Sequence, residues 1–296
     1  MKFADLLRKN RKDVALIIGN GIHQFSDSKN NSWDSLLATL SNRNGLSFDK
    51  VPKGASATEF FDVLALKSTG SNDSLARAFC DLMGSWKALS HHKKIVSWAI
   101  RNRVPILTTN FDEVLGNAAG IKLMRPKGKG FTDYYPWDSR FALELNEDPT
   151  KGFGIWHING MARYARSIRL GLTHYMGSAQ RVRGWLHIGD GRLFATKDDV
   201  NWPGSRTWLH IIFNKPLIIF GLGLGENEVF LRWLLIERAR YFAKFPDRRQ
   251  SAWFIQRDKP DDDTAAGRRF FLEGVGIECI DVTTHSDIYE SPAWDD

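Results

Sequence analysis

The chain has 296 residues, and 41 Lys and Arg against 34 Asp and Glu give it a formal net charge of +7. With 43% hydrophobic and 12% aromatic residues it has ample material for a core, which excludes a disordered, collagenous or coiled-coil protein. The only cysteines, Cys80 and Cys279, are too few for a four-cysteine zinc ribbon. The longest apolar runs, such as 14–18, are far shorter than the roughly 18 residues of a membrane span. Since no secretory leader is recognisable, we expect a cytoplasmic protein without membrane contact.

The basic residues are scattered, and their nearest approaches to clusters are Arg125/Lys127/Lys129, Arg163/Arg166/Arg169 and Arg181/Arg183. Such groups form either a solvated surface or a field that attracts polyanions, including nucleic acid, a nucleotide or an acidic partner. No Cys/His finger spacing and no aromatic RNP-type strand accompanies them, so the pattern leaves nucleic-acid binding open without supporting it.

The first third of the chain combines a buried strand with a long helical stretch. Val14 to Ile18 is a continuous apolar run that ends at Gly19, which is typical of a central parallel strand. Ser32 follows a polar loop and is placed to cap a helix. Residues 33–100 carry apolar stripes between polar turns. We therefore predict a helical insertion at about 33–100.

Further strands and helices alternate along the rest of the chain. Asp112 is placed to cap a short helix, 121–150 is rich in loops, and Glu226 and Glu228 lie in the predicted first turn of a helix that ends before Pro246. This alternation predicts a single α/β domain over 1–296 with a largely parallel sheet. The predicted further strands are Val104 to Thr108, Phe153 to His157, Ile168 to Leu172, Leu217 to Phe220, Trp253 to Gln256 and Ile277 to Val282.

Three of these strands end in unusual loops. Glycines follow two of them, at 19–21 and 221–225, and the run Thr-Thr-Asn-Phe-Asp follows a third at 108–112. Ligands of open α/β sheets bind at the carboxyl ends of the strands, where glycines let backbone N–H groups approach a phosphate. The loops predict a dinucleotide crevice. Each loop alone is a weak signal, because 19–21 lacks the third glycine of GxGxxG and the alternative for 221–225 is a simple tight turn. No GxxxxGK(S/T) sequence is present, which disfavours a P-loop NTPase.

The polar loop at 108–112 carries more functional groups than a turn requires. An amide both donates and accepts hydrogen bonds, so Asn110 is suited to hold a ribose hydroxyl or a water beside a reacting carbon. Asp112 is the second candidate, and its alternative role is that of a plain helix cap.

Five motifs follow one another over about residues 14–240: GNGI at 19–22, WDSLL at 33–37, TTNFD at 108–112, WHING at 156–160 and FGLGLGENEVFLRWLL at 220–235. Taken together, they resemble those of sirtuin-like domains, in the prokaryotic branch that hydrolyses NAD in antiphage defence. The resemblance implies a Rossmann-like sheet with helices on both faces, and it places Asn110 and Asp112 near the nicotinamide ribose. The residues it implies for NAD+ binding are Gly19, Asn20, Gly21, Ile22, Thr109, Asn159, Gly221, Leu222, Gly223 and Glu226.

The chain departs from that family at two points. It lacks the zinc cysteines of protein-deacylating sirtuins, and it has Asn159 where many relatives have the catalytic histidine of a His-x-His-Gly sequence. We therefore expect His157 to act as the base, on the same strand face two positions earlier. The alternative is a core histidine beside Trp156. No histidine pair has HExxH spacing, so no metal is expected.

The function expected from these features is NAD+ glycohydrolase activity, with NAD+ as substrate and no other cofactor. Uncontrolled NAD+ cleavage would harm the host, so we expect regulation by a protein partner, by homo-oligomerisation or by a signal. A catalytically silent nucleotide-binding sensor or scaffold is the alternative, which Asn159 keeps open. A basic subunit associated with nucleic acid is the third.

Overall fold

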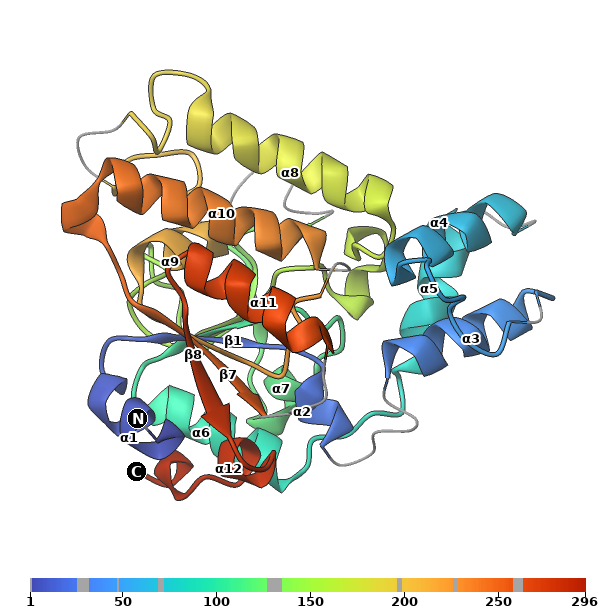
Figure 1. Ribbon diagram of the computed structural model, residues 1–296, viewed down its shortest axis with the longest axis horizontal. Helices are drawn as coiled ribbons and strands as arrows, with labels where there is room; N and C mark the ends of the chain where they lie inside the picture. The colour runs from blue at the N-terminus through green and yellow to red at the C-terminus, as the bar shows by residue number, and fades with distance from the viewer. Residues whose placement is uncertain are drawn as a thin grey trace.

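The computed structural model in Figure 1 describes residues 2–25, 32–46, 48–68, 72–126, 135–195, 199–225, 228–257 and 263–296. Within them, eight strands form one sheet in the order β3-β4-β5-β2-β1-β6-β7-β8. The strands are β1 (Ala15–Ile18), β2 (Pro105–Thr108), β3 (Leu123–Met124), β4 (Arg140–Phe141), β5 (Gly154–His157), β6 (Leu217–Phe220), β7 (Ala252–Arg257) and β8 (Glu278–Val282).

Six neighbouring strands, from β5 across to β8, pair in parallel, and the short β3 and β4 add an antiparallel edge beside β5. Counted in chain order, the six parallel strands lie in the sequence 3-2-1-4-5-6, which is the strand order of the Rossmann fold. The predicted α/β fold with a largely parallel sheet is therefore confirmed. The direction of strand addition reverses between β1 and β6, and this reversal is the topological switch point.

The central strands are apolar because both faces of the sheet are covered. Every residue of β1, β2, β5 and β6 is buried, which explains why β1 and β6 read as continuous apolar runs and why β2 and β5 are apolar up to their last residue. Pro105 occupies the first position of β2, where a missing N–H is tolerated.

Helices cover the two faces as two separate layers (Figure 1). One layer holds α8 (Leu172–His187), α9 (Trp208–Asn214), α10 (Val229–Lys244) and α11 (Asp263–Gly274), and the other holds α1 (Phe3–Asn10), α6 (Ser90–Arg101), α7 (Val114–Ala118) and α12 (Ser286–Tyr289). Each layer packs its own apolar cluster against the sheet. The predicted helices on both faces are confirmed.

A third group of helices projects from one side of this sandwich (Figure 1). This helical module consists of α3 (Trp33–Arg43), α4 (Ala57–Lys67) and α5 (Asn72–Leu82), and it has an apolar cluster of its own. As predicted, the Ser32 hydroxyl caps α3 by accepting from the Ser35 backbone N–H at 3.1 Å. The last helix of the predicted insertion, α6, instead packs Ile95, Val96 and Trp98 into the apolar cluster that lies between the sheet and the layer of α1, α6, α7 and α12. The module is therefore shorter than the predicted segment 33–100.

The strand predicted over Ile168 to Leu172 is wrong. Ile168 and Leu170 fill the core of the helical module, and Gly171 is the N-cap of α8. An Asp62 carboxylate oxygen accepts from the Leu172 backbone N–H at 2.9 Å and so begins that helix from a distant part of the chain. Alternating apolar residues here serve a different core, which a local pattern cannot reveal.

None of the helices in the described part of the chain combines the length and the apolar character needed to cross a bilayer.

Candidate functional site

A cavity of about 550 Å³ opens at the switch point, between the loops that follow β1 and β6. Asn20 and Gly21 line it from the first loop, and Gly221, Leu222 and Gly223 line it from the second. These are five of the residues predicted to bind NAD+. Because ligands of such sheets bind outside the strand ends at this reversal, the cavity is the candidate binding crevice.

The two glycine loops touch each other at the base of this crevice. The Gly21 backbone N–H donates to the Gly221 carbonyl at 2.8 Å. A Cβ added at Gly19 would lie 2.4 Å from Leu222 Cδ2, and Gly221 itself has φ +70°, a conformation that favours glycine. The glycines are therefore required for the close approach of the loops as well as for the shape of the crevice.

The outer part of the crevice mixes charges of both signs. Arg257 at the end of β7 and Asp34 on α3 both line it. Glu228, directly before α10, lines it as well, and burial raises the pKa of this carboxyl to about 7. The predicted ligand-binding residue Glu226 lies outside the described residues. Ile22 does not line the crevice. It is fully buried in the apolar cluster between the sheet and the layer of α1 and α6.

The polar loop after β2 lies beside the crevice but does not line it. The Thr108 hydroxyl donates to the Ile18 carbonyl at 2.9 Å and accepts from the Asn110 backbone N–H at 3.1 Å, which fixes the loop against β1. The side chain of Asn110 is 2% exposed, and neither its oxygen nor its nitrogen has a hydrogen-bond partner in the described part of the chain. Since buried amides are almost always hydrogen-bonded, this one marks a place for a ligand or a water.

Asp112 caps a helix, the alternative role given above, and makes a second contact as well. Its Oδ1 accepts from the Val114 backbone N–H at 2.9 Å, at the start of α7. Its Oδ2 lies 3.0 Å from Nε2 of His23, within ion-pair distance but outside good hydrogen-bond alignment. Burial raises the pKa of Asp112, yet the nearby His23 and the hydrogen bond from Val114 outweigh burial and leave that pKa below its usual value. A buried carboxylate thus stays ionised beside Asn110.

A line of histidines supports this carboxylate. The Leu89 backbone N–H donates to Nδ1 of His92 at 3.1 Å, so the proton of His92 is on Nε2, which lies 3.2 Å from Nδ1 of His23. Nδ1 of His23 is then an acceptor, so the N–H of this ring is on Nε2, the atom that lies 3.0 Å from Asp112 Oδ2. Burial lowers the pKa of His92 to about 3, so this ring stays neutral at physiological pH. Sequence reasoning missed both histidines, because no local spacing links positions that lie 69 residues apart.

His157 is fully buried and holds the same loop from the other side. Its Nε2 donates to the Asp112 carbonyl at 2.8 Å, its Nδ1 has no partner among the described residues, and burial lowers its pKa. β5 ends at His157, so strand alternation does not relate it to residue 159. Asn159 lies in the following turn, where its amide donates to the Thr109 carbonyl at 3.3 Å. The polar loop after β2 therefore forms one buried cluster with His157 at the end of β5 and Asn159 after it, next to the crevice.

Trp33 is the residue that connects the crevice with this cluster. It lines the crevice, stacks on Phe79 of the helical module with ring centroids 5.7 Å apart, and meets the ring of Phe111 edge-on at 5.1 Å. Phe111 lies between Asn110 and Asp112 in sequence, yet it packs into the core of the helical module. The module therefore covers the polar loop.

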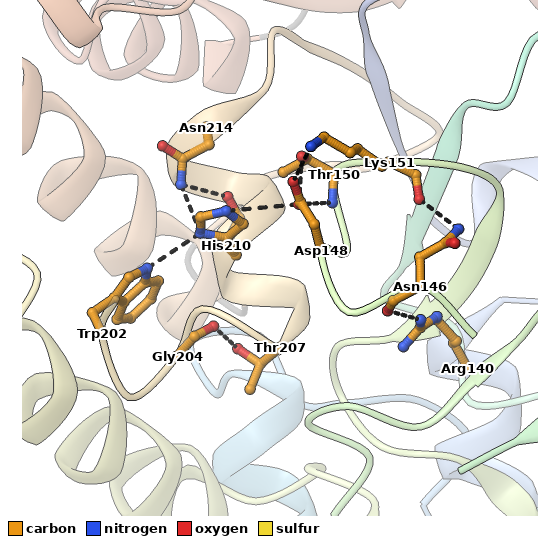
Figure 2. Close-up of polar contacts among 10 residues, drawn as sticks. All are labelled: Arg140, Asn146, Asp148, Thr150, Lys151, Trp202, Gly204, Thr207, His210 and Asn214. Carbon is orange, nitrogen blue, oxygen red and sulfur yellow. Dashed lines mark hydrogen bonds and ion pairs between the residues drawn. The ribbon is translucent and has the colours of Figure 1, made fainter. Parts of the chain in front are cut away.

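His210 illustrates a histidine without a role in this site (Figure 2). Its Nδ1 accepts from the Trp202 indole at 3.2 Å and contacts the Asn214 amide at 2.9 Å, and its Nε2 lies 3.8 Å from Asp148. The loop that carries Asp148 precedes β5 and Asn214 precedes β6, so the network lies at the amino edge of the sheet, opposite the crevice. It fastens α9 to the loop before β5.

No three or more His, Cys, Asp and Glu side chains come together as a metal site within the described ranges. Comparison with models of known protein families gives no match, and no curated protein is significantly similar to the chain.

Proposed function

We propose that the protein is an NAD+ glycohydrolase with a sirtuin-like architecture. The observation that carries the proposal is the unpartnered amide of Asn110, buried beside a crevice at the switch point of a sheet with Rossmann strand order. In this proposal the glycine loop after β6 offers backbone N–H groups to the pyrophosphate, and the polar loop is one strand away from β1. The residues that would hold the nicotinamide ribose are Asn110 and Asp112.

Nicotinamide is a good leaving group, so the protein mainly has to orient the ribose and the water and to stabilise the positive charge that develops on the ribose. When the bond between nicotinamide and C1 of the ribose breaks, both electrons leave with the cationic nicotinamide, and the ribose carbon becomes positively charged. The ionised Asp112 stabilises that charge, and the Asn110 amide orients the ribose or the attacking water. The water oxygen bonds to C1 and loses a proton. Nδ1 of His157 is the acceptor we propose, because Nε2 is already committed as a donor.

The burial of the polar loop supports a protein whose activity is controlled. Asn110 is 2% exposed, and Trp33 packs against Phe111, the next residue along the chain, so in this proposal the cover of Trp33 and the helical module shifts before a substrate reaches Asn110. A protein partner or self-association that displaces the module would supply that shift. In this proposal the cell loses NAD+ only after activation, as antiphage defence by NAD+ depletion requires.

The test is nicotinamide release from NAD+, measured by chromatography, with the protein alone and with candidate activators. Asn110→Ala is expected to lower the rate at least about 100-fold, since the amide acts in the transition state. Asn117→Ala, on the exposed side of α7, is the matched control and is expected to keep the wild-type rate.

Complete burial of His157 favours one other function, a nucleotide-binding module without turnover. NAD+ binding by calorimetry without nicotinamide release under any condition would support that module and refute the hydrolase. Salt-sensitive DNA binding in place of NAD+ binding would refute both.

A further inference from the structure

A second cavity, of about 690 Å³, lies along α8 and shares no lining residue with the crevice. Its side chains come from three parts of the chain: Trp137 before β4, Arg169 before α8, and His174, Ser178, Arg181 and Trp185 on α8 itself. No Asp or Glu lines it. Its volume is that of a site for a small organic ligand.

Arg169 gives this cavity an uncompensated positive charge. The guanidinium donates to the Ser178 hydroxyl at 3.1 Å and to the Arg166 carbonyl at 3.3 Å, and it lies over the Tyr135 ring at 4.6 Å. All these partners are neutral, and in the described part of the chain no carboxylate pairs with it. Burial lowers the pKa of Arg169. A largely buried cation without a counter-charge is costly, and an anion bound in the cavity would remove that cost.

Other groups around the cavity are also left without partners. The Trp137 indole N–H and Nδ1 of His174 are buried and have no hydrogen-bond partner among the described residues. Arg181 adds a second cation to the lining. The indoles of Trp137 and Trp185 meet at 4.9 Å and 68°, so the wall between them is apolar and formed by flat rings.

From these features we infer that the second cavity binds a nucleotide. The phosphate pairs with Arg169 and Arg181, and the base packs against the indole of Trp185. The unpartnered N–H of Trp137 and ring nitrogen of His174 supply a donor and a further polar contact.

The site is joined to the polar cluster through the main chain. The Arg169 backbone N–H donates to the Asn159 carbonyl at 2.7 Å, and the Asn159 amide in turn donates to the Thr109 carbonyl. A ligand that moves Arg169 therefore acts on the loop that carries Asn110. Such an effector role rests on the proposed function, whereas nucleotide binding here does not.

The experiment titrates the full chain by calorimetry with AMP, adenosine and inorganic phosphate as probes. Arg181→Met is compared with Arg183→Met, because both arginines are exposed on α8 and only Arg181 lines the cavity. We expect AMP to bind more tightly than either fragment. Arg181→Met is expected to weaken AMP about tenfold or more, and Arg183→Met is expected to have no effect.

Three results would overturn the inference: no AMP binding, equal AMP affinity in the two variants, or phosphate binding as tight as that of AMP. Equal affinity would place AMP in the crevice or on the surface, and tight phosphate would reduce the site to an adventitious anion. Arg169→Met with an unchanged melting temperature and lost AMP binding gives a second, independent check. Nicotinamide release is read separately, so failure of the hydrolase proposal leaves this outcome unaffected.

Discussion

Glu228 has no hydrogen-bonded cap partner at the start of α10, and burial raises the pKa of its carboxyl from 4.5 to about 7. Between these two values the folded protein holds a proton that the unfolded chain has released. The free energy of unfolding therefore falls as the pH rises through this window, and the loss is complete above pH 7. Glu228→Gln keeps the shape of the side chain and removes the titration.

The size of the effect follows from the two pKa values. For a shift from 4.5 to about 7, the ionisation of Glu228 costs the folded state about 0.8 kcal/mol at pH 5 and about 3.3 kcal/mol at pH 8. Glu228→Gln is therefore expected to raise the free energy of unfolding relative to wild type by up to about 2.5 kcal/mol more at pH 8 than at pH 5. The other titrating groups cancel in this comparison.

The assay is urea denaturation of wild type and Glu228→Gln at both pH values. Glu147→Gln, whose side chain is 88% exposed, controls for the removal of one negative charge. If the free energies of unfolding of wild type and Glu228→Gln differ by the same amount at pH 5 and pH 8, burial does not raise the pKa of this carboxyl. The reasoning about the polarity of the crevice would then fail with it.

Three further predictions test the neighbouring parts of the site. Gly19→Ala is expected to destabilise the protein by about 1–3 kcal/mol in thermal denaturation, since its Cβ would lie 2.4 Å from Leu222. The control Gly223→Ala is expected to leave the melting temperature unchanged, because its Cβ has no neighbour nearer than 3.9 Å. Equal losses of stability in the two variants would refute this account of the loops. Because burial lowers the pKa of His157 from 6.5, the wild type is expected to lose stability as the pH falls below about 6.5. In urea denaturation, His157→Gln is expected to show a smaller loss of stability over the same pH range. Parallel plots of stability against pH for the two proteins would contradict this prediction. Asp112→Asn removes the negative charge but keeps an oxygen that accepts from the first turn of α7. It is expected to lower the rate of nicotinamide release at least about tenfold and to leave the circular dichroism spectrum unchanged. An unchanged rate would exclude electrostatic stabilisation by Asp112.

The sheet was predictable because burial on both faces leaves a local signal. The strands β1 and β6 are continuous apolar runs followed by glycines at the crevice, and β2 and β5 are apolar up to their last residue. The helix α8 was not predictable in this way. Gly177 and Gly184 interrupt its pattern, and its first turn is held by Asp62, which lies 110 residues before Leu172.

The candidate site was predictable only as far as residue type and strand position determine it. Asn110 and Asp112 follow a strand end, so their placement beside the crevice could be inferred. The line from His92 through His23 to Asp112 first joins α6 to the short helix α2 (Gly21–Gln24), across 69 positions, and then joins α2 to the loop after β2. No sequence spacing indicates these contacts. The burial of Glu228 likewise depends on how α10 meets the rest of the fold.

The double role of Trp33 makes exposure of the polar loop and occupancy of the crevice thermodynamically linked. The ring of Trp33 lines the crevice and also contacts Phe111 in the polar loop. A ligand that must reach Asn110 therefore has one affinity for the protein with this loop covered and a higher affinity for the protein with the loop uncovered. If the uncovered state is rare, the apparent affinity falls by its fraction. Any partner that holds the helical module away from Phe111 then tightens ligand binding, and by reciprocity the ligand tightens partner binding by the same factor.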